Sequence, residues 1–243
     1  MTEETELFIA GSPDDLAREA ASRFVALAAE AIGRHGRFSV ALSGGSTPRC
    51  LYTLLTESPF LQLVDWSKVY LFFADERFVP LDHEDSTYRL VAETLLSGAP
   101  IPKENIFPIP TNAQSAEEGA KLYATELSSF FGGSTPSFDL MLLGMGPDGH
   151  TASLFPGRSF LEGAVAAVYD SPKPPPTRIT LTFSLINHAR NILFLVTGGD
   201  KAKTLKEIFT QSGETDLPAA RVLPVNGTMA WLVDKAAASQ IIE

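Results

Sequence analysis

Residues 138–150 read Phe138-Asp139-Leu140-Met141-Leu142-Leu143-Gly144-Met145-Gly146-Pro147-Asp148-Gly149-His150, and this stretch decides the fold class of the chain. Its first half is an apolar run, typical of a strand that is buried on both faces in a parallel sheet covered by helices. Its second half is a glycine-rich loop. Ligands of such sheets bind beyond the carboxyl ends of the strands, so this loop is a candidate functional site.

Strand-like and helix-like patterns alternate on both sides of this stretch. Further strands are expected at residues 7–9, 38–42, 69–74, 164–169, 179–182, 192–196 and 229–233, and helices at 13–35, from Pro48 onward, at 86–96 and at 115–131. The alternation predicts an α/β fold, with a Rossmann-like, doubly wound, mostly parallel sheet and helices on both faces. We expect one domain spanning residues 1–243, because strands continue on both sides of the proline-rich connection at 171–176.

The composition excludes several classes of function. Lysine and arginine total 19 against 29 aspartates and glutamates, which gives a formal net charge of −10. Such a chain lacks the basic surface that nucleic acids and anionic membranes require, so neither partner is predicted. The single cysteine, Cys50, cannot form an intrachain disulfide, and the acidic residues 1–6 differ from a signal peptide, which predicts a cytoplasmic protein. Cys50 is expected to pack in a helix as a small hydrophobe.

The loop at residues 43–48 is the first of three candidate sites at strand ends. It reads Ser43-Gly44-Gly45-Ser46-Thr47-Pro48 and joins a strand to a helix. Exposed backbone N–H groups, two hydroxyls and the positive end of a helix dipole suit an anion, above all a phosphate. The alternative is a tight strand–helix turn with an N-cap. The spacing of a Walker A loop is absent.

Charged residues form the second candidate. Asp75, Glu76 and Arg77 follow the predicted strand at 69–74, where they serve either chemistry or a solvated ion pair. Arg178 opens a later strand-like run, and Lys201 lies at a strand-to-helix junction. Each of these two is a solvated charge unless it converges with the loop at 43–48.

The third candidate is the loop at 144–150, which matches the pattern Gly-x-Gly-x-x-Gly. A dinucleotide site needs a long helix that opens at the third glycine, and Pro156-Gly157 stops any helix too early. The loop instead presents Asp148 and His150, and histidine is suited to act as a general base near neutral pH. The alternative is a structural histidine in a turn.

Two other chemistries are not supported. The chain has no Gly-x-Ser-x-Gly nucleophile elbow, which argues against a serine hydrolase. Residues 82–85 (Asp82-His83-Glu84-Asp85) are more simply a polar cap before a helix than a metal site, because neighbours in a loop rarely converge on one ion. No metal site is predicted.

Together these motifs resemble the 6-phosphogluconolactonase family over residues 10–235. The resemblance rests on residues 42–48, 73–77, 139–157, 178–180 and 198–202, in that order along the chain, and the Gly-Met-Gly-x-Asp-Gly-His block is its most specific part. It implies a Rossmann-like domain and the hydrolysis of 6-phospho-D-glucono-1,5-lactone to 6-phosphogluconate, the second step of the oxidative pentose phosphate pathway. It implies no metal or organic cofactor.

The resemblance also implies roles for single residues. His150 would be the general base toward water, Asp148 would orient its imidazole, and Asp75 would position the water or a sugar hydroxyl. Residues 43–47 (Ser43, Gly44, Gly45, Ser46 and Thr47) would hold the 6-phosphate, with Arg178 and Lys201 neutralising it, while Arg77 serves either the phosphate or the oxyanion. The sugar phosphate is the one expected partner, and we expect a monomer or a weak homodimer.

Two rival functions remain open. Glucosamine-6-phosphate deaminases belong to the same superfamily. At the position of Arg77 they have a tyrosine, in an Asp-Glu-Tyr sequence, and five residues after the histidine they have a glutamate, where this chain has Phe155. A phenylalanine cannot transfer a proton. The second rival is a non-catalytic sugar-phosphate sensor, but the first 40 residues contain one long predicted helix and no basic recognition helix.

Overall fold

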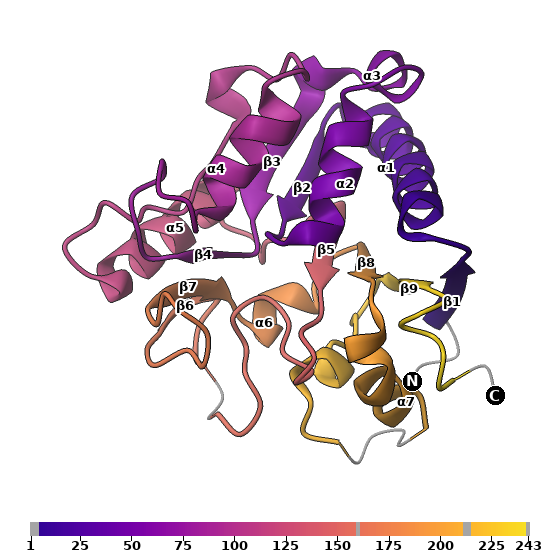
Figure 1. The fold of residues 1–243 in the computed structure, drawn as a ribbon. Coiled ribbons are helices and arrows are strands. Elements are labelled where there is room, and N and C mark those ends of the chain that lie inside the picture. The colour runs from indigo at the N-terminus through magenta and orange to yellow at the C-terminus, as the bar shows by residue number, and fades with distance from the viewer. Residues whose placement is uncertain (1–4, 159–160, 211–214, 242–243) are drawn as a thin grey trace.

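The computed structural model describes residues 5–158, 161–210 and 215–241. Its centre is a six-stranded sheet in the order β1-β9-β8-β5-β2-β3, with every neighbouring pair parallel (Figure 1). The strands are β1 (Thr5–Ala10), β2 (Phe38–Leu42), β3 (Val69–Phe73), β5 (Leu140–Gly144), β8 (Asn191–Val196) and β9 (Thr228–Asp234). The predicted parallel sheet is confirmed.

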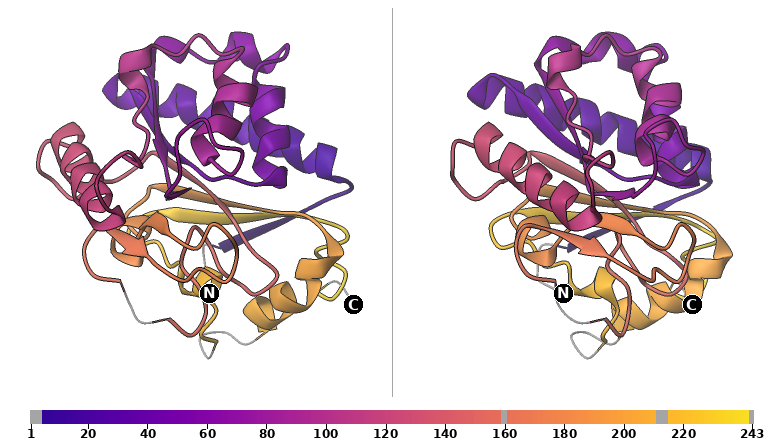
Figure 2. Two further views of the ribbon diagram at one scale, coloured as in Figure 1. Left: turned by 60° about the vertical axis from the view of Figure 1, so that its left-hand side comes forward. Right: turned by 90° about the vertical axis from the view of Figure 1, so that its left-hand side faces the viewer.

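Helices cover both faces of this sheet. Figure 2 shows α1 and α2 on one side of the sheet and α7 on the other. The helices are α1 (Pro13–His35), α2 (Ser46–Leu55), α3 (Phe60–Leu63), α4 (Thr87–Val91), α5 (Ala116–Phe130), α6 (Phe183–Ile186) and α7 (Ala202–Thr210), and a π-helical turn (Ala92–Leu96) extends α4. The predicted α/β class and the helix layers on both faces are therefore confirmed.

Local sequence signals explain where the longest helix begins and ends. The Ser12 hydroxyl accepts a hydrogen bond from Asp15 N at 3.1 Å, and Pro13 occupies the first turn, where its missing N–H costs nothing. Gly36 ends α1 in the left-handed conformation at φ 80°, which glycine adopts without strain. Cys50 lies in α2, as predicted, but it is exposed, so the prediction that it is a packed small hydrophobe is wrong.

A second sheet was not anticipated from the sequence. It contains three antiparallel strands in the order β4-β7-β6: β4 (Asp75–Arg77), β7 (Arg178–Leu181) and β6 (Val165–Val168). Residues 75–77 thus form a short strand, not a loop. Ala74 joins the two sheets, because its N–H donates to Leu42 O at 2.8 Å and its carbonyl accepts from Leu181 N at 2.8 Å.

The topology gathers the candidate loops at one edge. Strands β8, β5, β2 and β3 are consecutive neighbours, and their carboxyl ends point the same way. The segments that leave these ends begin at Thr197, Met145, Ser43 and Ala74. Four stretches far apart in the sequence therefore meet beside one another, as expected for an open parallel sheet.

Candidate active site

One cavity of about 290 Å³ lies at this carboxyl edge of the sheet. Predicted site residues from all three candidate loops and from both separate basic positions line it: Ser43, Gly44, Gly45, Ser46, Thr47, Asp75, Arg77, His150, Arg178 and Lys201. Asp148 does not line the cavity but contacts His150, which does. The convergence that the sequence argument required is present in the structure.

His150 and Asp148 form a hydrogen-bonded pair. His150 Nδ1 lies 2.5 Å from Asp148 Oδ1, so the imidazole donates from Nδ1 and keeps the Nε2 lone pair free of any described partner. Partial burial raises the pKa of the Asp148 carboxyl, but the hydrogen bond and the charge of His150 outweigh burial and hold this pKa below its ordinary value. The ring of His150 also packs on that of Phe155, with centroids 4.9 Å apart.

Gly146 makes this pair possible. A Cβ atom at residue 146 would lie 2.1 Å from His150 Cε1 and 2.6 Å from Asp148 Oδ1, far inside van der Waals contact. The loop also closes on itself, because Gly146 N donates to His150 O and Gly149 N donates to Gly146 O, each at 2.9 Å. The glycine at 146 therefore sets the position of the imidazole.

The loop at residues 43–47 leads into the N-terminus of α2. Ser43 is held from two sides, because its hydroxyl donates to Leu142 O at 2.8 Å and its carbonyl accepts from the buried Tyr52 hydroxyl at 2.7 Å. Thr47 Oγ1 lies 2.7 Å from Thr197 Oγ1, which also lines the cavity. The first residues of α2, Ser46 and Thr47, thus line the cavity on a fixed support, and a helix N-terminus is suited to an anion.

Arg77 and Arg178 stand directly opposite each other on β4 and β7. Two like charges in a cross-strand pair repel. Burial, and after it the charge of Arg77, lowers the pKa of the Arg178 guanidinium. Arg77 Nε is buried and has no hydrogen-bond partner among the described residues. Two crowded guanidinium groups on one cavity wall are suited to an anion.

Each of these arginines is held in place by backbone carbonyl groups. Arg77 Nη1 donates to Asp85 O at 2.9 Å, and a Cβ on Gly44 would lie 3.3 Å from the same nitrogen. Arg178 donates through Nε to Pro175 O at 2.8 Å and through Nη2 to Lys173 O at 3.0 Å. The proline-rich segment, expected only as an exposed connection, therefore helps to form the site.

Lys173, which lies in that segment, also lines the cavity and was missed by the sequence analysis. Its proline-rich surroundings carried no functional signal. Lys201 lines the cavity as well, with its ammonium group 2.8 and 2.9 Å from the two carboxylate oxygens of Asp200. Asp75 is the one carboxylate among the cavity-lining residues described, so the cavity is positive although the whole chain is acidic.

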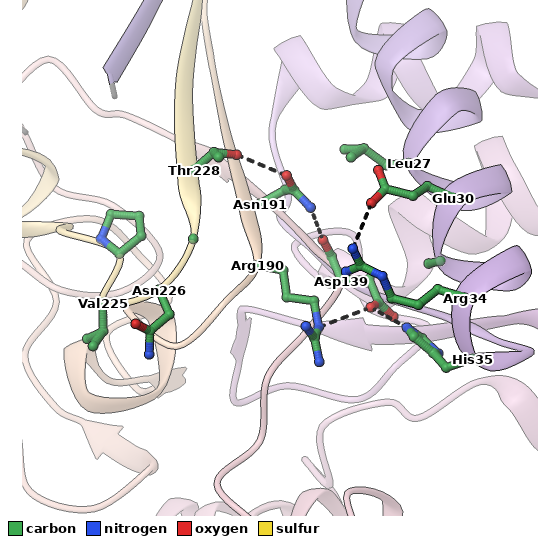
Figure 3. A pocket seen from close by; sticks show the side chains of 13 residues that line it. Leu27, Glu30, Arg34, His35, Asp139, Arg190, Asn191, Val225, Asn226 and Thr228 are labelled. Atoms are coloured by element: carbon green, nitrogen blue, oxygen red, sulfur yellow. Dashed lines mark hydrogen bonds and ion pairs between the residues drawn. The ribbon is translucent and has the colours of Figure 1, made fainter. Parts of the chain in front are cut away.

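A larger cavity, of about 750 Å³, lies at the opposite edge of the sheet (Figure 3). It contains a second histidine–aspartate pair, with His35 Nε2 at 2.9 Å from Asp139 Oδ1. Asp139 Oδ2 accepts from Ser39 N at 2.9 Å and from Ser39 Oγ at 2.8 Å, and Arg190 Nε lies 3.5 Å from Oδ1. These contacts tie the end of α1 to β2 and β5, as a structural link does.

The sequence model that describes "Glucosamine-6-phosphate isomerases/6-phosphogluconolactonase" matches residues 11–231. The chain belongs to this family. Within the ranges 5–158, 161–210 and 215–241, no three or more His, Cys, Asp or Glu side chains are arranged to hold a metal ion. No helix in these ranges has the length and apolar character needed to span a membrane.

Individual members of the glucosamine-6-phosphate isomerase/6-phosphogluconolactonase family resemble the chain over nearly its full length. A rat protein named 6-phosphogluconolactonase is 43% identical over 93% of this chain and 90% of its own. A rice protein named probable 6-phosphogluconolactonase 3, chloroplastic, is 43% identical over 97% of this chain and 76% of its own. The structure of 6-phosphogluconolactonase from Trypanosoma cruzi superposes with a TM-score of 0.88 at 31% identity, covering 99% and 98% of the two chains.

Proposed function

We propose that this protein hydrolyses 6-phospho-D-glucono-1,5-lactone to 6-phospho-D-gluconate, the lactonase step of the oxidative pentose phosphate pathway. The observation that carries the proposal is one cavity lined both by His150, which is hydrogen-bonded to Asp148, and by two opposed arginines. The histidine supplies a base that activates water, and the arginines supply a binding site for a phosphate dianion. The relatives named 6-phosphogluconolactonase support the choice of substrate.

In the proposed mechanism His150 acts first as base and then as acid. Its free Nε2 takes a proton from a water molecule while the water oxygen attacks the lactone carbonyl carbon. The tetrahedral oxyanion collapses by breaking the bond to the ring oxygen, which receives the proton from the imidazolium. The new carboxylic acid then loses its own proton to solvent. A lactone is an activated ester, so no covalent nucleophile is needed.

The remaining site residues hold the substrate in this proposal. The 6-phosphate lies at the N-terminus of α2 beside Arg77 and Arg178, because Arg77 lies against Gly44, Arg178 is its cross-strand partner, and both line the cavity with this loop. Arg77 is thereby assigned to the phosphate, and the backbone N–H groups of the glycine loops are left to stabilise the oxyanion. Asp75 accepts a hydrogen bond from a sugar hydroxyl or from the attacking water.

The deaminase alternative lacks a proton-transfer group. Phe155 occupies the position of the glutamate that deaminases carry, and its ring packs against His150 in the cavity. Ring opening and amine loss need a second acid–base group near the sugar, and phenylalanine has none. The family model covers both activities, so the two features that separate them are Phe155 and, at the position where deaminases have a tyrosine, Arg77.

An assay with two substrates tests the function. Freshly generated phosphogluconolactone, followed with and without protein against its spontaneous hydrolysis, is expected to disappear faster with the protein. Glucosamine 6-phosphate, assayed in parallel by ammonia release, is expected to give no product. Ammonia release would favour the deaminase, and binding of 6-phosphogluconate without turnover of either substrate would favour a sugar-phosphate sensor.

The Lys201→Ala variant is expected to raise KM for the lactone by about three- to tenfold and to leave kcat nearly unchanged. The effect is modest because Asp200 already offsets part of the charge of Lys201, and partly exposed ion pairs are worth about 1 kcal/mol or less. Steady-state kinetics provide the measurement. A fall in kcat alone would contradict a phosphate-binding role for this residue.

Three further expectations belong to this proposal. A single cysteine is compatible with a reducing compartment, and we place the protein in the cytoplasm, although the rice relative is described as chloroplastic.

We treat residues 1–243 as one domain, supported by one cluster of buried apolar side chains drawn from both sheets and the helices. A monomer or weak homodimer is expected, which sedimentation analysis measures.

A further inference from the structure

Ser153 is a buried hydrogen-bond partner of Asp75. Its hydroxyl donates to Asp75 Oδ2 at 2.7 Å, and this is the one hydrogen bond that the Asp75 carboxylate receives from the described residues. Both side chains are buried, with 1% of Ser153 and 7% of Asp75 exposed. Asp75 lines the cavity, whereas Ser153 does not. One carboxylate oxygen is therefore held by protein and the other is left for a ligand.

The backbone fixes Ser153 in turn. Ser153 N donates to Thr180 Oγ1 at 3.2 Å, and Thr180 Oγ1 donates to Leu181 O at 3.0 Å. Thr180 is the residue paired with Asp75 across β4 and β7. The chain Thr180–Ser153–Asp75 thus joins the loop that contains His150 to the sheet that contains the two arginines, entirely through buried polar groups.

We infer that Ser153 is a positioning residue that acts on the reaction through Asp75; the inference rests on the proposed lactonase function. The terminal torsion of an aspartate is broad, so a carboxylate without a partner rotates. The Ser153 hydroxyl removes this freedom and aims the second oxygen of Asp75 into the cavity. A hydrogen bond from Asp75 to the substrate or to water then meets its target without prior reorganisation.

The chain contains a matched pair that separates positioning from stability. At the opposite edge of the sheet, Ser39 Oγ donates to Asp139 Oδ2 at 2.8 Å, and both residues are buried. Asp139 is the carboxylate at the centre of the cavity in Figure 3, away from every predicted site residue. Removing either serine hydroxyl deprives a buried aspartate of a donor, but only one of these aspartates faces the proposed substrate.

The experiment compares variants of the full chain in the lactone assay. Ser153→Ala is expected to lower kcat/KM by about 10- to 100-fold, the effect of a misplaced reactive group, while Ser39→Ala changes it by about twofold or less. Thermal unfolding of both variants measures the stability lost with each hydroxyl, so that a loss of activity can be separated from a loss of fold. Ser153→Cys, whose thiol is a weaker donor of similar shape, is expected to lie between Ser153→Ala and the wild type.

A double-mutant cycle supplies the readout that a merely structural role would not move. If Ser153 acts through Asp75, then Ser153→Ala in an Asp75→Ala background lowers kcat/KM by no more than about twofold. Two outcomes would overturn the inference and leave the lactonase function standing, provided that the wild type is active. One is that the losses of kcat/KM from Ser153→Ala and Asp75→Ala add up in the double variant, and the other is that Ser153→Ala and Ser39→Ala are equally active. A wild-type protein without lactonase activity would overturn the proposed function itself, and the role of Ser153 with it.

Discussion

Replacing His150 by alanine is expected to lower kcat for lactone hydrolysis by about 10²- to 10⁴-fold, the range for loss of a general base. The reason is geometric, because His150 lines the cavity, Asp148 occupies its Nδ1, and Nε2 has no partner among the described residues. Binding of 6-phosphogluconate, measured by calorimetry, is expected to stay within a few-fold of wild type, since the phosphate contacts lie on other elements. Steady-state kinetics supply kcat.

His35 provides the control for this variant. It forms the other histidine–aspartate pair, with Asp139 at the opposite edge of the sheet. His35→Ala is expected to lower the melting temperature and to leave kcat near the wild-type value. Activity of His150→Ala equal to that of His35→Ala would remove His150 from the mechanism. Adding Asp148→Ala to the His150→Ala variant is expected to lower kcat little further, because the two residues act as one unit.

The second large effect is expected at Arg178. Arg178→Met should raise KM by about 30-fold or more, equivalent to about 2 kcal/mol, because a buried charged partner of the phosphate is lost. Arg178→Lys should recover only part of this loss, since an ammonium group cannot reproduce the fork that contacts Pro175 O and Lys173 O. Steady-state kinetics check both values.

Thermal unfolding with 6-phosphogluconate gives an independent measure of the same effect. A ligand that binds only the folded state stabilises it by RT ln(1 + [L]/Kd), so tighter binding gives a larger rise in melting temperature at a given ligand concentration. With the ligand at a concentration near the wild-type Kd, the rise seen for wild type is expected to be nearly abolished in Arg178→Met and preserved in Arg190→Met, a control at the opposite edge of the sheet. An unchanged KM with a lower kcat would move Arg178 from the phosphate to the reacting carbonyl group.

Much of the fold could be predicted because its signals are local. The serine cap, the proline and the glycine that bound α1 act within a few residues, and the strand at 38–42 follows from its apolar run. The convergence of Arg77, His150 and Lys201 could be predicted because carboxyl ends of parallel strands share an edge. These arguments need no knowledge of long-range contacts beyond the parallel arrangement.

Other features depend on pairings between distant segments. Strand β4 has three residues, and only its pairing with β7, about a hundred positions later, makes it a strand. Lys173 lies in the site because Arg178 donates hydrogen bonds to carbonyl groups of the proline-rich segment, Pro175 O and Lys173 O. Ser153 carries no sequence signal for contact with Asp75. Tertiary contacts decide such positions, which local propensity and periodicity do not report.

The close approach at Gly146 bears on how glycine motifs are interpreted. In the nucleotide-binding fingerprint, the second glycine of Gly-x-Gly-x-x-Gly admits the pyrophosphate of a cofactor. Residue 146 is the second glycine of the same pattern, yet the space above it is taken by the imidazole of the chain's own His150. The two uses share one sequence pattern because both need a residue without a Cβ at this position. The group that occupies that space, not the spacing of the glycines, distinguishes a loop that binds a cofactor from a loop that accommodates a side chain of the protein itself.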